Sequence, residues 1–202
     1  VIEFVCGLTI AAVLVCIQFL LKSYFSGFSW VLNPELTVST IIESLRWNLN
    51  SVLYEELLFR GYLLYKAIEL SGVRKGCLVS AIAFGIYHWF SYGVFGNLVP
   101  MIYVFLLTGS FGLVMAYAYA KSQSVVLPIA LHLGWNLTTI FGFSSGPLGA
   151  QLLIANMSTP QAMNGIEQLI VSIGVPALFL LLVYWLIAHR VNQYQSVSNQ
   201  AS

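Results

Sequence analysis

Two adjacent glutamates and an arginine in the stretch YEELLFRGYL can carry out or support acid–base chemistry. Residues four apart share a face of a helix, so Glu56 and Arg60 can neutralise one another, whereas Glu55 is rotated by about 100° and points elsewhere. A carboxylate in such a position can act as general base on a water molecule. The alternative for Glu56 and Arg60 is a purely structural buried ion pair. That alternative does not account for Glu55.

Two further groups of residues have the same four-residue spacing. His88 shares a helix face with Phe84, and His132 shares one with Asn136. Imidazole and amide groups can hold a water molecule or donate hydrogen bonds to the oxyanion of a tetrahedral intermediate. Counting about 1.5 Å per residue from the expected helix ends places Glu55, both histidines and the asparagine in one band of the bilayer. Each histidine taken alone could equally be a structural residue that hydrogen-bonds between helices.

The rest of the chain has a composition that suits lipid. Of its 202 residues, 59% are apolar and 7% are charged, against about 25% charged in a soluble domain. Ionisable residues inside a membrane cost at least ~2.5 kcal/mol each, which makes them a functional-site hypothesis. The net charge of +1 and the scattered basic residues exclude a nucleic-acid partner. The three cysteines lie in apolar runs and predict no disulfide framework.

Six apolar segments predict an all-α, polytopic membrane protein, a bundle of about six transmembrane helices. They cover residues 4–21, 37 or 39–72, 76–90, 98–120, 124–143 and 169–189. Loops are expected at 23–34 and 144–168. We expect one transmembrane helical domain over 1–190, with its motif core at 50–140, and a polar, disordered tail over 191–202. Because the chain starts at Val1 within an apolar run, we also expect further N-terminal spans outside this sequence.

The basic residues predict the orientation of the chain, because they are enriched in cytoplasmic loops. Arg74, Lys75, Lys121 and Arg190 follow the second, fourth and sixth segments, and Lys22 follows the first. The C-terminus is therefore expected in the cytoplasm. With no targeting segment or long lumenal domain in view, we expect a multi-pass protein of the bacterial cytoplasmic membrane.

The three motifs together resemble those of a known protease family. EELLFR, FGIYH and HLGWN are similar to the motifs EExxxR, FxxxH and HxxxN of the CPBP family, the CAAX proteases and bacteriocin-processing enzymes also called the Abi family. They occur in the family's order and on separate predicted helices. The resemblance implies an intramembrane endopeptidase, similar to the type II CAAX prenyl endopeptidases, that hydrolyses a peptide bond in a membrane-associated or lipidated peptide.

The resemblance also implies a role for each motif residue. Glu55 would be the general base that activates water, and His88 would help to hold that water. His132 and Asn136 would stabilise the oxyanion. Glu56 and Arg60 would orient the helix or the carboxylate. The site prediction thus has five catalytic and two supporting residues: Glu55, Glu56, His88, His132 and Asn136, with Arg60 and Phe84.

The cofactor stays open at the level of the sequence. Glu55, His88 and His132 would supply the three protein ligands of a catalytic zinc site, with a fourth position for water. The HExxH signature of soluble zinc proteases is absent, and the family has been described both as metalloproteases and as metal-free glutamate proteases. We favour the glutamate mechanism with Asn136 as an oxyanion donor. No serine or cysteine nucleophile is needed, and neither Thr138 nor Thr139 has the paired base that nucleophilic activation requires.

Two other function classes are weighed against the protease. Members of the family are also associated with bacteriocin self-immunity and with scaffolding of sensor kinases, so a non-proteolytic membrane protein is the main alternative. A proton-coupled transporter would show repeated halves, and the sequence has none. The expected partners are a peptide or lipidated protein substrate and the lipid bilayer, but the residues predict neither the substrate's identity nor the oligomeric state.

Overall fold

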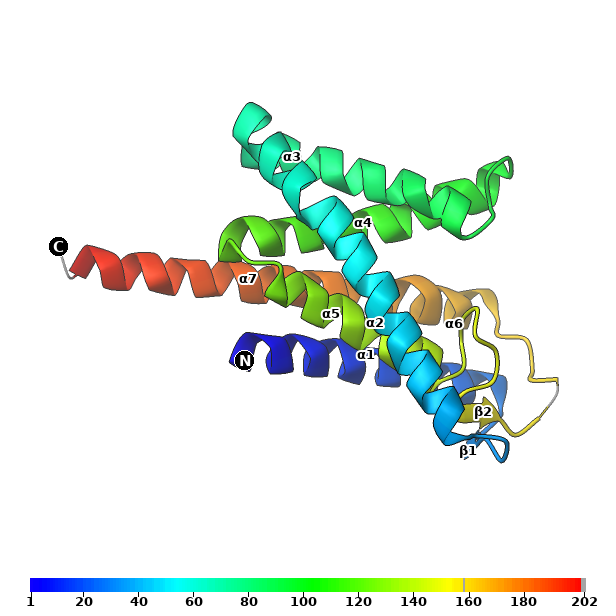
Figure 1. The fold of residues 1–202 in the computed structure, drawn as a ribbon. Helices are drawn as coiled ribbons and strands as arrows, with labels where there is room; N and C mark the ends of the chain where they lie inside the picture. Colours follow the sequence, from blue (N-terminus) through cyan, green and yellow to red (C-terminus); the bar gives the residue numbers. More distant parts are fainter. Residues whose placement is uncertain (158, 201–202) are drawn as a thin grey trace. The chain divides into compact units, whose positions relative to one another are not determined.

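The chain is helical almost throughout, apart from one pair of short strands (Figure 1). The computed structural model describes residues 1–157 and 159–200, with side chains described as far as His189. Its elements are α1 (Ile2–Ser26), β1 (Trp30–Leu32), α2 (Val38–Arg60), α3 (Tyr62–Ser91), α4 (Leu98–Ser122), α5 (Val126–Asn136), the π-helix η1 (Leu137–Gly142), β2 (Leu153–Ala155), α6 (Gly165–Leu169), the π-helix η2 (Ile170–Gly174) and α7 (Val175–Gln200). The all-α prediction is confirmed. Helix α7 includes residues 191–200, while 201 and 202 lie outside the described residues, and the disorder of 191–202 stays a prediction.

Three of the described helices are long and apolar enough to cross a membrane. They cover Ile2–Ser26, Leu98–Ser122 and Gly165–His189, and a shorter apolar helix covers Val126–Gly142. Helices α2 and α3 carry several charged residues and fall outside this group. The chain therefore fits a polytopic membrane protein, and the number of six spans stays a prediction.

The predicted single helix from residue 37 or 39 to Gly72 is wrong, because the backbone already leaves the helix at Gly61. At Gly61 the backbone has φ −80° and ψ −129°, and this residue separates α2 from α3. At Gly72, within α3, φ is 80° and ψ is 165°. Only glycine adopts that conformation without strain. Gly72 is thus a break, as the sequence indicates, whereas the break at Gly61 was not predicted.

The chain divides into two compact units. The first unit contains Val1–Glu55 and Ile129–Pro176, and the second contains Glu56–Pro128 and Ala177–Ser202. This is a division by packing and does not test the prediction of a single domain over 1–190.

In the first unit, α1 packs against η1 and η2. A buried cluster of Val15, Phe19 and Phe143 forms part of its core, and the rings of Phe19 and Phe143 stack with centroids 4.7 Å apart. Strands β1 and β2 pair antiparallel, with Trp30 opposite Ala155 (Figure 1). Both strands lie where the sequence predicts loops. Short strands of three residues carry too little periodicity to be recognised in a sequence.

In the second unit, α3 packs along α4 (Figure 1). Leu64, Cys77 and Ala116 form a buried cluster between them. Glycine allows the close approach, since a Cβ on Gly85 would lie 2.7 Å from the ring of Phe105. These packed helices fix the positions of the polar residues described below.

Candidate active site

Helix α2 buries a polar stripe within the first unit. Ser44, Asn48, Val52 and Glu55 follow one another at spacings of four, four and three, and all four are buried. That spacing keeps them on one face of the helix. Asn48 Nδ2 donates a hydrogen bond to the carbonyl of Ser44 at 2.9 Å. The stripe ends in the Glu55 carboxylate, which is 7% exposed.

Glu55 meets His132 of α5 inside the first unit. Glu55 Oε2 lies 3.9 Å from His132 Nε2, and His132 is 5% exposed. This distance is longer than a direct hydrogen bond. It brings a carboxylate and an imidazole, separated by 77 positions, into one buried pair. Two of the predicted site residues are therefore neighbours in space.

The end of α5 is held close to α1 by a glycine between the two motif residues. A Cβ on Gly134 would lie 2.5 Å from the backbone oxygen of Leu8. Asn136 is half-buried and is the last residue of α5. Immediately after it the chain continues as the π-helix η1, where Thr138 Oγ1 donates to the carbonyl of Gly134 at 2.8 Å. Such π-helical segments are rare and often occur at functional sites.

Replacing Gly134 by alanine should separate α1 from α5, because the added methyl group meets backbone and not a flexible side chain. We expect a loss of about 1–3 kcal/mol in the free energy of unfolding, measured as a lower thermal midpoint in detergent. Gly142→Ala is the matched control, since its nearest neighbours would be 3.7 Å away, an ordinary contact. Equal midpoints for the two variants would contradict the close approach.

In the second unit, Glu56 and Arg60 form a buried ion pair. Arg60 Nη1 lies 3.0 Å from Glu56 Oε1, and both side chains are 0% exposed. Arg60 Nη2 also donates to the carbonyl of Gly112 on α4 at 3.3 Å. The pair therefore joins the end of α2 to α4. This supports the structural alternative for these two residues.

Phe84 lies between this ion pair and His88. The Arg60 guanidinium carbon is 4.1 Å from the Phe84 ring centroid, a cation–π geometry. The ring centroids of Phe84 and His88 are 4.4 Å apart. A Cβ on Gly112 would lie 3.0 Å from the Phe84 ring, so this glycine makes room for it. These contacts connect the predicted supporting residues, Arg60 and Phe84, to His88.

His88 is fixed in one orientation by the backbone of its own helix. Its Nδ1 lies 2.8 Å from the carbonyl oxygen of Phe84. Because a carbonyl oxygen only accepts, Nδ1 carries the proton, and the lone pair of the neutral ring is on Nε2. His88 is 6% exposed. The i,i+4 spacing seen in the sequence thus corresponds to a real hydrogen bond.

The predicted residues therefore fall into two described groups. Glu55, His132 and Asn136 belong to the first unit, and the remaining four belong to the second: Glu56, Arg60, Phe84 and His88. Sequence reasoning missed Gly112 and Gly134 as positioning residues. Only the structure supplies the Phe84 ring beside Gly112 and the Leu8 backbone beside Gly134.

The described residues contain no group of three His, Cys, Asp or Glu side chains that could hold a metal ion. A catalytic zinc site uses three protein ligands, and within the first unit the pair of Glu55 and His132 supplies two. The set of Glu55, His88 and His132 thus stays a prediction.

The chain is similar to one described protein family. The sequence model of the family described as type II CAAX prenyl endopeptidase Rce1-like matches residues 37–138. This range contains every residue of the predicted site. No curated protein and no solved structure matches the chain.

Proposed function

The chain belongs to the Rce1-like family of type II CAAX prenyl endopeptidases, and on this premise we propose that it is an intramembrane endopeptidase. Its family is one of intramembrane proteases, and its apolar helices are those of a membrane protein. The proposed substrate is a membrane-associated or lipidated peptide. The proposed nucleophile is a water molecule activated by glutamate and histidine.

The observation that carries the proposal is the buried pair of Glu55 and His132. Their facing atoms are 3.9 Å apart, which allows one water oxygen to lie about 2.8 Å from each of them. In that position, the carboxylate accepts a hydrogen bond from the water and the imidazole N–H donates one to it. A direct hydrogen bond between the two side chains would leave no room for this arrangement. The distance between Glu55 Oε2 and His132 Nε2 thus favours a water molecule shared by the two side chains.

The reaction follows from the chemistry of these groups. Glu55 takes a proton from the water as its oxygen attacks the peptide carbonyl carbon. The carbonyl oxygen becomes an oxyanion, which the N–H groups of His132 and Asn136 stabilise by hydrogen bonds. Glu55 then passes the proton to the amide nitrogen, and the C–N bond breaks. One water is consumed, and the products are a new carboxylate and a new amine.

The second group of residues takes the remaining roles in the proposal. The fixed tautomer of His88 leaves a lone pair on Nε2, which suits a residue that positions water. We assign Glu56 and Arg60 a positioning role and no proton transfer, because each neutralises the other's charge in a buried ion pair. Phe84 contacts both Arg60 and His88. It would therefore help to hold the His88 ring in place.

The location and the class of substrate extend the proposal. We place the protein in the bacterial cytoplasmic membrane with its C-terminus in the cytoplasm, as the basic residues indicate. Bacterial substrates of fitting chemistry include a bacteriocin leader and a peptide pheromone precursor. A prenylated peptide requires a host that prenylates proteins.

The proposal is tested with the full chain in detergent and a library of lipidated, quenched-fluorescent peptides. We expect wild type to cleave at least one peptide and His132→Leu to lower kcat/KM by about 10² to 10³-fold, because an oxyanion donor is lost. His189→Leu is the matched control: it changes an exposed histidine outside the site and should leave kcat/KM unchanged. No cleavage by wild type, or equal rates for the two variants, would count against the proposal. A parallel arm with a zinc chelator separates the glutamate mechanism, where the rate is kept, from a metalloprotease.

A further inference from the structure

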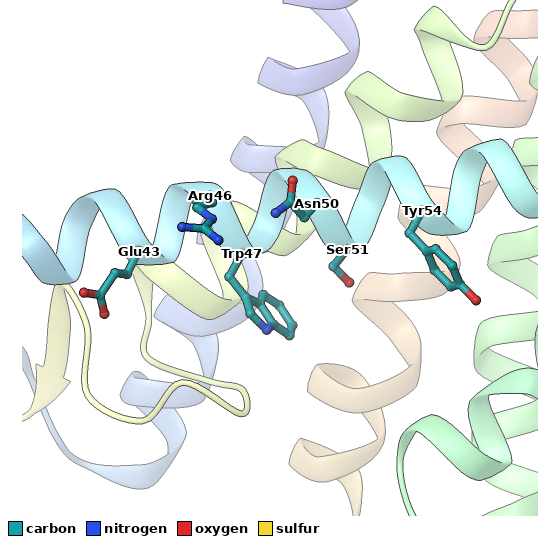
Figure 2. A pocket seen from close by; sticks show the side chains of 6 residues that line it. All are labelled: Glu43, Arg46, Trp47, Asn50, Ser51 and Tyr54. Atoms are coloured by element: carbon teal, nitrogen blue, oxygen red, sulfur yellow. The ribbon is translucent and has the colours of Figure 1, made fainter.

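A series of polar side chains leads along α2 from the exposed start of the helix to Glu55, within the first unit. Its members recur at spacings of three or four residues and therefore share one helix face. They are Thr37, Thr40, Ser44, Asn48, Ser51 and Glu55. Thr37 is exposed and Thr40 is half-buried, whereas Ser44 and Asn48 are 1% and 0% exposed. Ser51 is half-buried and lines a pocket of about 500 Å³ on α2 (Figure 2).

Asn48 is the most deeply buried member of this polar series, and only one end of its amide has a partner. Its Nδ2 donates a hydrogen bond to the carbonyl of Ser44 at 2.9 Å. Its Oδ1 is buried and accepts no hydrogen bond from any group in the described part of the chain. A buried acceptor without a donor is unfavourable, and such atoms usually bind an ordered water molecule. The Asn48 amide thus indicates a buried hydration site.

The alternative role for such residues is to join helices, since serine and asparagine side chains can hydrogen-bond from one helix to another. The hydrogen bonds of the described residues do not support it here. Asn48 Nδ2 reaches the carbonyl and the hydroxyl of Ser44, at 2.9 and 3.5 Å, within α2 itself. At the start of the helix, Thr37 Oγ1 and Thr40 Oγ1 are 2.8 Å apart and bond to each other. These contacts attach α2 to no neighbouring helix.

The spacing of the polar series fits a chain of water molecules. Steps of three and four residues advance about 4.5 and 6 Å along a helix. A water molecule that makes two hydrogen bonds of about 2.8 Å joins oxygen atoms up to about 5.6 Å apart. One water molecule for each step therefore connects neighbouring members of the series.

We propose that the polar series holds a chain of ordered water molecules, with Asn48 as its central water-binding residue, and that this chain supplies water to Glu55. The supply role rests on the proposed endopeptidase function. Each turnover consumes one water molecule at a carboxylate that is 7% exposed, so the water must be replaced through the protein. Asn48 is a positioning residue, because it acts on the reaction through water molecules and not on the peptide.

The water chain is tested without any substrate by X-ray footprinting of the full chain in detergent. Brief irradiation splits bound water into hydroxyl radicals in place, and mass spectrometry locates the side chains that they oxidise. Val52 follows Ser51 directly, and Val15 belongs to the apolar cluster with Phe19 and Phe143. Both valines are 0% exposed, which makes Val15 the matched control. We expect oxidation of Val52 and none above background at Val15, and equal oxidation or equal protection of the two would overturn the proposal.

Two substitutions of Asn48 connect the water chain to the reaction. Asn48→Leu removes the amide at similar size and should abolish the oxidation of Val52. It should also lower kcat by about 10-fold with KM unchanged, because one hydrogen bond to the water chain is lost. Asn48→Ser keeps a hydroxyl, leaves room for a further water molecule, and should retain both the oxidation and the rate of wild type.

Thermal unfolding of the same preparations separates this role from a structural one. An apolar replacement of a partly unsatisfied buried group is often nearly neutral, so Asn48→Leu should keep the midpoint of wild type. If Asn48→Leu leaves kcat and the oxidation of Val52 unchanged, or if Asn48→Ser loses as much as Asn48→Leu, the assignment of Asn48 is overturned. Should Asn48→Leu fail to fold, the serine variant and the two valines of wild type still decide.

The two readouts distinguish this proposal from the proposed function. Oxidation of Val52 that depends on Asn48, without cleavage of any peptide by wild type, would support the water chain and overturn the endopeptidase. Cleavage by wild type with Val52 protected would support the endopeptidase and overturn the water chain. The absence of both would overturn both.

Discussion

Replacing Glu55 by glutamine should abolish proteolysis while leaving the protein folded. The change removes the general base, which is worth about 10² to 10⁴-fold in rate, and it keeps the shape of the side chain. Because Glu55 is buried and a neutral amide is cheaper to bury than a carboxylate, the thermal midpoint should stay equal or rise. The measurement pairs kcat/KM for a cleaved peptide with thermal unfolding of the same preparation.

The control for this prediction is Glu35→Gln. Glu35 is an exposed glutamate of the first unit, before the start of α2, and the same chemical change there should alter neither quantity. A Glu55→Gln variant that cleaves at the rate of wild type would remove the carboxylate from the mechanism. A variant that loses activity together with its folded state would reassign Glu55 to a structural role.

Replacing Arg60 by alanine should destabilise the protein by about 3–5 kcal/mol, because it leaves the Glu56 carboxylate buried without its arginine. The change also removes the hydrogen bond to Gly112 and the cation over the Phe84 ring. The expected readout is a large drop in the thermal midpoint and a loss of monodisperse protein in detergent. Glu56→Gln combined with Arg60→Met should recover most of the stability, since an apolar replacement of a buried pair is often neutral.

Lys66→Ala gives the matched control for the broken ion pair. Lys66 and Glu69 are 2.6 Å apart but 41% and 51% exposed, so their separation should cost about 1 kcal/mol or less. If Arg60→Ala is no more destabilising than Lys66→Ala, the pair of Glu56 and Arg60 does not hold α2 to α4. If the double variant is as unstable as Arg60→Ala, packing around the arginine matters more than its charge.

The helices and the residue types of the site could be predicted from the sequence, because both depend on patterns within a few neighbouring residues. Long apolar runs produce the three spans whatever they pack against. The i,i+4 spacings became contacts because helical geometry alone brings such residues together. The ion pair of Glu56 with Arg60 and the hydrogen bond of His88 Nδ1 to the Phe84 carbonyl are of this kind.

The features that the sequence did not predict depend on distant partners. The pairing of β1 with β2 joins residues more than 100 positions apart, and the break at Gly61 interrupts an otherwise continuous helical pattern. The π-helix after Asn136 arises where α1 packs against η1.

The central claim is that water activated at Glu55 and His132 hydrolyses a peptide bond. The most direct measurement is mass spectrometry of a peptide cleaved by the full chain in water enriched in ¹⁸O. We predict one ¹⁸O atom in the new carboxylate of the product with wild type, and no product above background with Glu55→Gln. Product of the same amount and label from both proteins, or no product from wild type with any lipidated peptide, would contradict the account.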